Sequence, residues 1–116
     1  MIPLHTTVLT AIPACLNFRI TPLPFFLRMN YYKTMDVVIE YNPSAFKHGF
    51  TETAIRYAIM NVIYDDIWDE TEDKHLLLGF DNNGNLLEIM YNVIDENTIN
   101  VFHAMNCQSI YYHLIN

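Results

Sequence analysis

The chain has 116 residues, of which 52% are hydrophobic and 16% charged, and its formal net charge is −7. This length suits one small domain with one core, and the composition excludes a disordered chain. Residues 36–116 contain three Lys/Arg and all thirteen Asp/Glu, which gives this part of the chain a net charge of −10. Residues 1–35 contain three Lys/Arg and no acid. The acidic part argues against broad binding to nucleic acid phosphates, and it suits a basic protein partner.

The cysteine and acid patterns predict neither a metal nor another cofactor. Cys15 and Cys107 lie far apart and match no disulfide framework and no zinc spacing. The acidic run at residues 65–73 lacks the alternating spacing and central glycine of a calcium loop. No segment reaches the roughly 18 apolar residues that a membrane span needs. We therefore expect a reduced, cytoplasmic protein with no membrane partner.

Residues 1–34 are predicted to lie outside the domain. They are apolar, hold four of the five prolines and show no steady period, and proline interrupts helices. The start is not basic and Pro13 breaks the apolar run, which disfavours a signal peptide. We expect a poorly structured arm, or an incorrectly assigned start with the true start at Met29 or Met35. Residues 35–116 then form a single domain; an apolar arm that packs on a partner is the alternative.

The first half of this domain reads as a strand followed by two helices. Residues 36–41 are short and β-branched, as strands are. Ser44 can cap a single helical turn that Gly49 ends. Thr51 can cap a second helix. The apolar residues of that helix recur at helical spacing, and they are Ile55, Ala58, Ile59, Val62 and Ile63.

The second half reads as an acidic connector, three strands and a short helix. Residues 65–73 are the connector, and Asn83-Gly84 is a strong hairpin signal between strands at 74–80 and 86–93. Residues 98–104 form the third strand, and residues 109–114 a short closing helix. The expected fold is α+β: an N-terminal strand, two helices, a three-stranded antiparallel meander and a short C-terminal helix.

Several short motifs within residues 36–112 follow the order of a known family. In chain order they are Glu40-Tyr41 before Asn42-Pro43, the turn Lys47-His48-Gly49, Glu52 opening a helix, Lys74 five residues before Gly79, Gly84 with Leu86-Leu87, and His103 before Ala104 at a strand end. The set resembles the BrnT-type toxins of bacterial type II toxin–antitoxin systems, a branch of the RelE-like ribonuclease superfamily. The Lys-His-Gly turn is its most specific part.

The resemblance implies a RelE/BrnT-like fold and a metal-independent endoribonuclease that inhibits translation. It also implies a cognate DNA-binding antitoxin, of ribbon-helix-helix or helix-turn-helix type, and a homodimer within the toxin–antitoxin complex. The family usually has Arg at the positions of Lys74 and Met105, so bidentate phosphate recognition is lost here. The alternative is a catalytically degenerate toxin-fold protein that only binds a protein partner. A DNA-binding regulator is disfavoured because no basic recognition helix is present.

Cleavage of RNA by its own 2′-hydroxyl needs a base, an acid and a group that stabilises the charged phosphorane. Histidine titrates near neutrality and can fill the first two roles. Aromatic rings can stack on the bases of single-stranded RNA. The candidates are His48 and His103 for acid and base, Lys47 and Lys74 for phosphate, and Tyr111 and Tyr112 for stacking. The ordinary alternatives are a helix-capping His48, a core His103 and solvated lysines.

Overall fold

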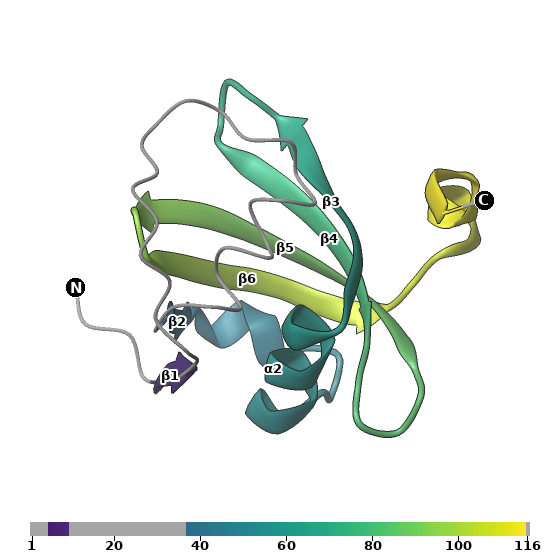
Figure 1. The fold of residues 1–116 in the computed structure, drawn as a ribbon, viewed down its shortest axis with the longest axis horizontal. Helices are drawn as coiled ribbons and strands as arrows, with labels where there is room; N and C mark the ends of the chain where they lie inside the picture. The colour runs from purple at the N-terminus through teal and green to yellow at the C-terminus, as the bar shows by residue number, and fades with distance from the viewer. Residues whose placement is uncertain (1–4, 10–36, 116) are drawn as a thin grey trace, which may run out of the picture.

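The computed structural model describes residues 5–9 and 37–115, and its centre is a mixed sheet of six strands (Figure 1). The strand order is β1-β2-β6-β5-β4-β3, and only the β2–β6 pair is parallel. The strands are β1 (His5–Leu9), β2 (Val37–Tyr41), β3 (Val62–Asp69), β4 (Lys74–Phe80), β5 (Leu86–Asp95) and β6 (Thr98–Asn106). The helices are η1 (Pro43–Phe46), α2 (Glu52–Met60) and η2 (Ser109–Ile115), of which η1 and η2 are 3-10 helices. The α+β class is confirmed.

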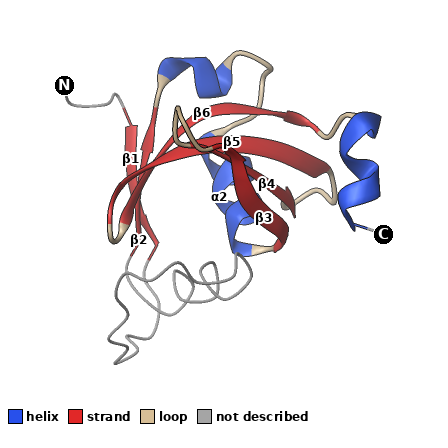
Figure 2. Ribbon diagram, turned by 90° about the horizontal axis from the view of Figure 1, so that it is seen from above, coloured by secondary structure: helices blue, strands red, loops and turns tan. Residues whose placement is uncertain are grey.

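Both faces of the sheet carry a core. Successive side chains of a strand point to opposite faces, and Leu76, Leu77 and Leu78 of β4 are all fully buried. Leu77 belongs to the larger core with α2 and η1, whereas Leu76 and Leu78 belong to a smaller one with Cys107 and Tyr111. Figure 2 shows α2 against the middle of the sheet and η2 beyond the end of β6. The continuous leucine run of β4 therefore reflects burial on both faces.

The predicted second helix begins where expected but ends earlier. Thr51 caps α2, and its side chain accepts a hydrogen bond from the Ala54 N–H at 3.1 Å. The helix stops at Met60, so Val62 and Ile63 belong to β3 rather than to the helical stripe. The reason is tertiary: the end of α2 lies directly on β4, and the Phe80 N–H donates to the Asn61 carbonyl at 3.3 Å. The first predicted helical turn is η1, which Asn42 caps instead of Ser44.

The three predicted antiparallel strands are present as β4, β5 and β6, but the predicted meander lacked a fourth strand, β3, which pairs antiparallel with β4. The segment expected to be an acidic connector supplies most of β3, up to Asp69. Its acidic residues are compatible with a strand. Asp65 is buried, and its carboxylate accepts a hydrogen bond from the Tyr91 hydroxyl at 2.7 Å, whereas Asp66 is exposed to solvent. Cross-strand pairing with β4 overrides the local preference for a connector.

The predicted hairpin at Asn83-Gly84 is confirmed. Gly84 has φ +81°, a left-handed conformation that glycine adopts without strain. The Asp81 carboxylate accepts hydrogen bonds from Asn83 N, Asn85 N and Asn85 Nδ2, at 2.9, 2.8 and 3.1 Å. Burial alone would raise the pKa of Asp81, but these hydrogen bonds outweigh it and hold the pKa below its ordinary value.

A short part of the predicted arm is described. β1 pairs antiparallel with β2, from His5 opposite Tyr41 to Leu9 opposite Val37. The rest of the arm, residues 1–4 and 10–34, and the two alternative start positions lie outside the described residues. Within the described part of the chain, no helix is both long and apolar enough to cross a membrane.

Candidate functional site

The candidate site lies where β6 continues past the end of β2. The two strands pair only as far as Tyr41 and Val101, so the next part of β6 has an open edge. The chain after β2 closes this edge, because Asn42 N donates to the Val101 carbonyl at 2.8 Å and Ser44 Oγ to the Phe102 carbonyl at 2.6 Å. These bonds fix η1 beside β6, and the Lys47-His48-Gly49 turn follows directly.

His48 and His103 meet at this edge. Their ring centroids are 5.6 Å apart and the ring planes are inclined by 78°. His48 is exposed in the turn after η1, where Gly49 has φ +89°. His103 stands opposite Met90 beside an irregularity in the β5–β6 register, and such bulges redirect side chains. The structure therefore brings together the two histidines that the sequence suggested as acid and base.

A buried carboxylate that no sequence pattern predicted, Glu88, holds His103. Glu88 of β5 is only 1% exposed, and its Oε2 lies 2.9 Å from His103 Nε2. Gln108 donates its backbone N–H to Glu88 Oε1 at 2.9 Å, and its Nε2 lies 3.0 Å from Oε2. A buried charge needs such partners to offset its desolvation. The available signal was a single charged residue inside the apolar stretch of residues 86–91.

The carboxylate also acts on two neighbouring side chains. Burial and, second, the negative charge of Glu88 raise the pKa of the Cys107 thiol. The same two causes, in the same order, raise the pKa of the Tyr111 phenol, with a smaller effect from Cys107. A thiol with a raised pKa carries little thiolate near neutral pH. Cys107 is therefore unsuited to act as a nucleophile beside the histidines.

The two predicted phosphate ligands lie in different places. Lys47 is exposed at the end of η1 and immediately precedes His48. Lys74 begins β4, which β5 separates from β6, an offset of about 10 Å across the sheet. Its Nζ lies 2.8 Å from Glu72 Oε1, and this hydrogen bond, with the charge of Glu72, raises the pKa of Lys74. Only Lys47 thus adjoins the histidine pair, while Lys74 already has an anionic partner.

The two predicted stacking residues differ in exposure. Tyr111 is 7% exposed and packs edge-on against Trp68, with ring centroids 5.3 Å apart. Its ring is part of the smaller core and presents no free face for a nucleobase. Tyr112 is 49% exposed on η2. Of this pair, only Tyr112 offers the surface that stacking requires.

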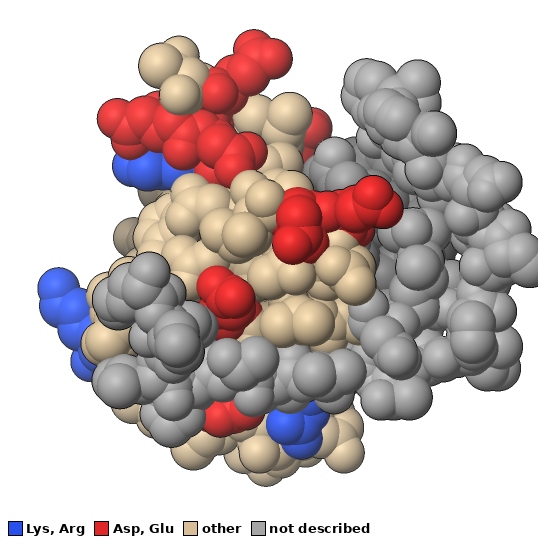
Figure 3. Space-filling model, turned by 90° about the vertical axis from the view of Figure 1, so that its left-hand side faces the viewer, with Lys and Arg blue, Asp and Glu red and all other residues tan. Residues whose placement is uncertain are grey.

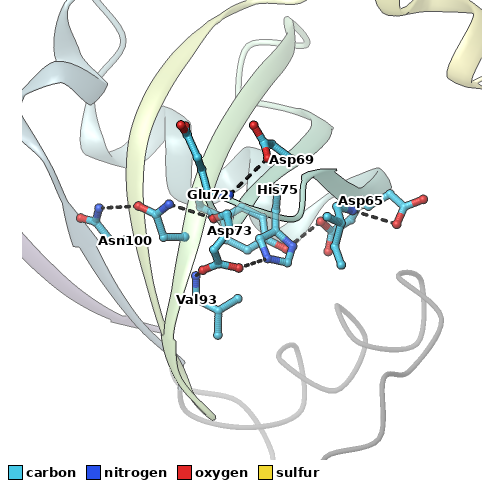
Figure 4. A network of polar contacts seen from close by, with 11 residues as sticks. Asp65, Asp69, Glu72, Asp73, His75, Val93 and Asn100 are labelled. Atoms are coloured by element: carbon cyan, nitrogen blue, oxygen red, sulfur yellow. Dashed lines mark hydrogen bonds and ion pairs between the residues drawn. The ribbon is translucent and has the colours of Figure 1, made fainter.

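A second polar network lies apart from the histidine pair and has a structural role (Figure 4). Asp73 has φ +53°, and its carboxylate contacts His75 Nε2 and accepts from Val93 N, both at 2.9 Å. His75 is buried and stacks on Tyr91, with ring centroids 4.8 Å apart. This network fastens the β3–β4 turn to β5.

Comparison of the chain with protein-family models, with curated proteins and with solved structures gave no significant match. Within the described residues, no group of three or more His, Cys, Asp or Glu side chains could hold a metal ion. The molecule is thus an α+β protein with a mixed sheet, and its candidate site is a pair of imidazoles anchored by one buried carboxylate.

Proposed function

We propose that this protein is the toxin component of a type II toxin–antitoxin system, a BrnT-like endoribonuclease that inhibits translation without a metal. The observation that carries the proposal is the 5.6 Å approach of the His48 and His103 rings. Two adjacent imidazoles can share the acid and base roles of RNA transesterification. The α+β class of the fold, with helices beside a mixed sheet, is compatible with the proposal.

Lys47 supplies the positive charge of the proposed site. It adjoins His48 and is exposed, so its ammonium group can approach a phosphate that lies against the two rings. One lysine replaces the planar guanidinium groups that the resemblance implies at the positions of Lys74 and Met105. We therefore expect weaker binding of RNA than an arginine-containing site would give.

A second candidate function is binding of a protein partner by a toxin fold that has lost its activity. The surface charge favours it: Figure 3 shows carboxylates gathered over the β3–β4 turn, at the top of the view. Ile67 and Trp68 of β3 are 45% and 47% exposed next to these acids. An acidic surface with exposed apolar side chains suits a basic partner such as a DNA-binding antitoxin.

Induced expression of the full chain in a bacterial host separates the two functions. Wild type and the variants His48→Ala and His103→Ala are compared by growth and by incorporation of labelled amino acids. His113→Ala is the matched control, because His113 is an exposed histidine of η2. The ribonuclease proposal expects arrest by wild type and His113→Ala, and growth with the other two variants.

Purified protein provides the biochemical part of the same test. Cleavage of single-stranded RNA that persists in excess EDTA supports a metal-independent nuclease. Folded wild-type protein that neither arrests growth nor cleaves RNA contradicts the proposal. Co-purification with the product of an adjacent gene then supports the partner-binding function.

A further inference from the structure

We infer that Glu88 is a positioning residue that keeps a proton on Nε2 of His103, so that His103 acts as the base through Nδ1 and His48 acts as the acid. This assignment rests on the proposed ribonuclease function. It adds a residue that the sequence did not indicate and divides the roles of the two histidines.

The hydrogen bonds of Glu88 determine which ring nitrogen of His103 carries the proton. Gln108 approaches both carboxylate oxygens with N–H groups, its backbone N at 2.9 Å from Oε1 and its Nε2 at 3.0 Å from Oε2. Both carboxylate oxygens thus accept from N–H groups, which is the pattern of a carboxylate that can only accept hydrogen bonds. Because Oε2 lies 2.9 Å from His103 Nε2, that nitrogen must donate, and it therefore bears hydrogen.

Nδ1 of His103 is then the ring nitrogen that can accept a proton from a substrate. A neutral imidazole has one N–H and one lone pair, so the Nε2–H form carries its lone pair on Nδ1. Glu88 is the hydrogen-bond partner of His103 among the described residues, and it occupies Nε2. The His103 side chain is 25% exposed. A proton on a bound hydroxyl can thus pass to Nδ1 while Glu88 stabilises the positive charge that develops on the ring.

His48 has the complementary environment. It is exposed, and its contact among the described residues is the ring of His103 rather than a hydrogen-bonding side chain. Among the described residues no carboxylate contacts it, so its ring is open to solvent and can rotate toward a leaving group. This freedom suits the general acid, whereas the fixed His103 suits the base that must meet one particular hydroxyl.

The reaction balances without any further reactant. His103 Nδ1 removes the 2′-hydroxyl proton, and the 2′-oxygen forms a bond to the adjacent phosphorus. The bond between phosphorus and the 5′-oxygen breaks, and the His48 imidazolium gives that oxygen its proton. The products are a 2′,3′-cyclic phosphate and a 5′-hydroxyl end, and each histidine finishes in the other's starting protonation state.

The first test measures the His103 proton by NMR and does not depend on activity. With ¹⁵N-labelled full-length protein in mildly alkaline buffer, we expect the Nε2–H tautomer of His103 and a low-field, slowly exchanging Nε2 proton. Glu88→Gln should lose this slow exchange. Glu72→Gln, which changes an exposed glutamate paired with Lys74, should keep it. A proton on Nδ1 in wild type, or a rapidly exchanging Nε2 proton, would overturn the inference without requiring that any variant folds.

The second test assigns acid and base with RNA that carries sulfur in place of the bridging 5′-oxygen. A thiolate leaving group needs no proton. A variant that lacks the general acid should therefore cleave this substrate normally, whereas a variant that lacks the general base should not. We expect His48→Ala to lose about 10²- to 10⁴-fold on ordinary RNA and to recover on the sulfur substrate, whereas His103→Ala stays impaired on both. Rescue of His103→Ala instead would reverse the roles and overturn the inference. Failure of wild type to cleave either substrate rejects the ribonuclease function. The NMR experiment tests the role of Glu88 independently of that outcome.

Discussion

Glu88 Oε2 lies 2.9 Å from Nε2 of His103, and this contact joins a buried carboxylate to an imidazole that reaches the surface. Glu88 comes from β5 and His103 from the next strand, diagonally across the sheet, since Met105 stands opposite Glu88 and Met90 opposite His103. The contact therefore depends on the β5–β6 register. It gives the histidine pair one member held by a carboxylate, His103, and one exposed member, His48.

Removal of the Glu88 carboxylate should destabilise the fold. In Glu88→Ala the donors of His103 and Gln108 lose their charged acceptor, and hydrogen bonds to charged groups contribute about 1.5–3 kcal/mol. Because Gln108 is exposed and water can replace one partner, we expect a loss of about 2 kcal/mol in the free energy of unfolding. Urea unfolding measures this loss, and Glu72→Gln is the exposed control. Equal stability of Glu88→Ala and wild type would show that the network contributes nothing.

Gly79 should not tolerate any side chain. A Cβ at this position would lie 2.0 Å from the Ala58 carbonyl oxygen, which is backbone of α2 and cannot move aside alone. Gly79→Ala must separate α2 from β4, and we expect a loss of at least about 3 kcal/mol. Gly84→Ala is the matched comparison, because a Cβ there meets nothing within 4 Å and the cost is the strain of φ +81°, about 1–2 kcal/mol. Thermal unfolding that ranks Gly84→Ala as the more damaging change would refute the proposed packing.

Asp81 should make stability depend on pH in the acid range. Its pKa is lower in the folded chain than in the unfolded chain, where aspartate has a pKa of about 3.9. The carboxylate therefore contributes stability that is complete above about pH 4 and is lost as the pH falls through the folded pKa. Unfolding measured at several pH values below 5 should show a shallower decline for Asp81→Asn than for wild type. Parallel declines would contradict this role.

Asp73 should stabilise the β3–β4 turn by two separable effects. Asp73→Asn keeps a residue type that accepts φ +53° but loses the charge that faces His75, whereas Asp73→Ala loses both the charge and every side-chain hydrogen bond. We expect a cost of about 1 kcal/mol for Asn and about 2–3 kcal/mol for Ala, which leaves the Val93 N–H without its acceptor. Amide hydrogen exchange at Val93 gives a local readout. Unchanged exchange in Asp73→Ala would show that water or another group replaces the carboxylate.

The sequence by itself determined the elements that depend on neighbours a few residues away. Thr51 caps α2, and Asn83-Gly84 turns the β4–β5 hairpin, because capping and turn formation need only local hydrogen bonds and the backbone freedom of glycine. The two histidines were also recognisable, because their chemistry is a property of the side chain. Their proximity was not predictable from the sequence, and it emerges from the fold.

Tertiary structure alone decided where the helix ends, that an acidic segment becomes β3, and which residues share the site. β3 exists because its backbone pairs with β4 across a short turn, and because Tyr91, which is distant in sequence, gives buried Asp65 a donor. Glu88 joins His103 through the strand register, and Lys74 is kept away by the intervening β5. These outcomes depend on long-range pairing and burial, whose energies outweigh local propensity and leave no short-range pattern in the sequence.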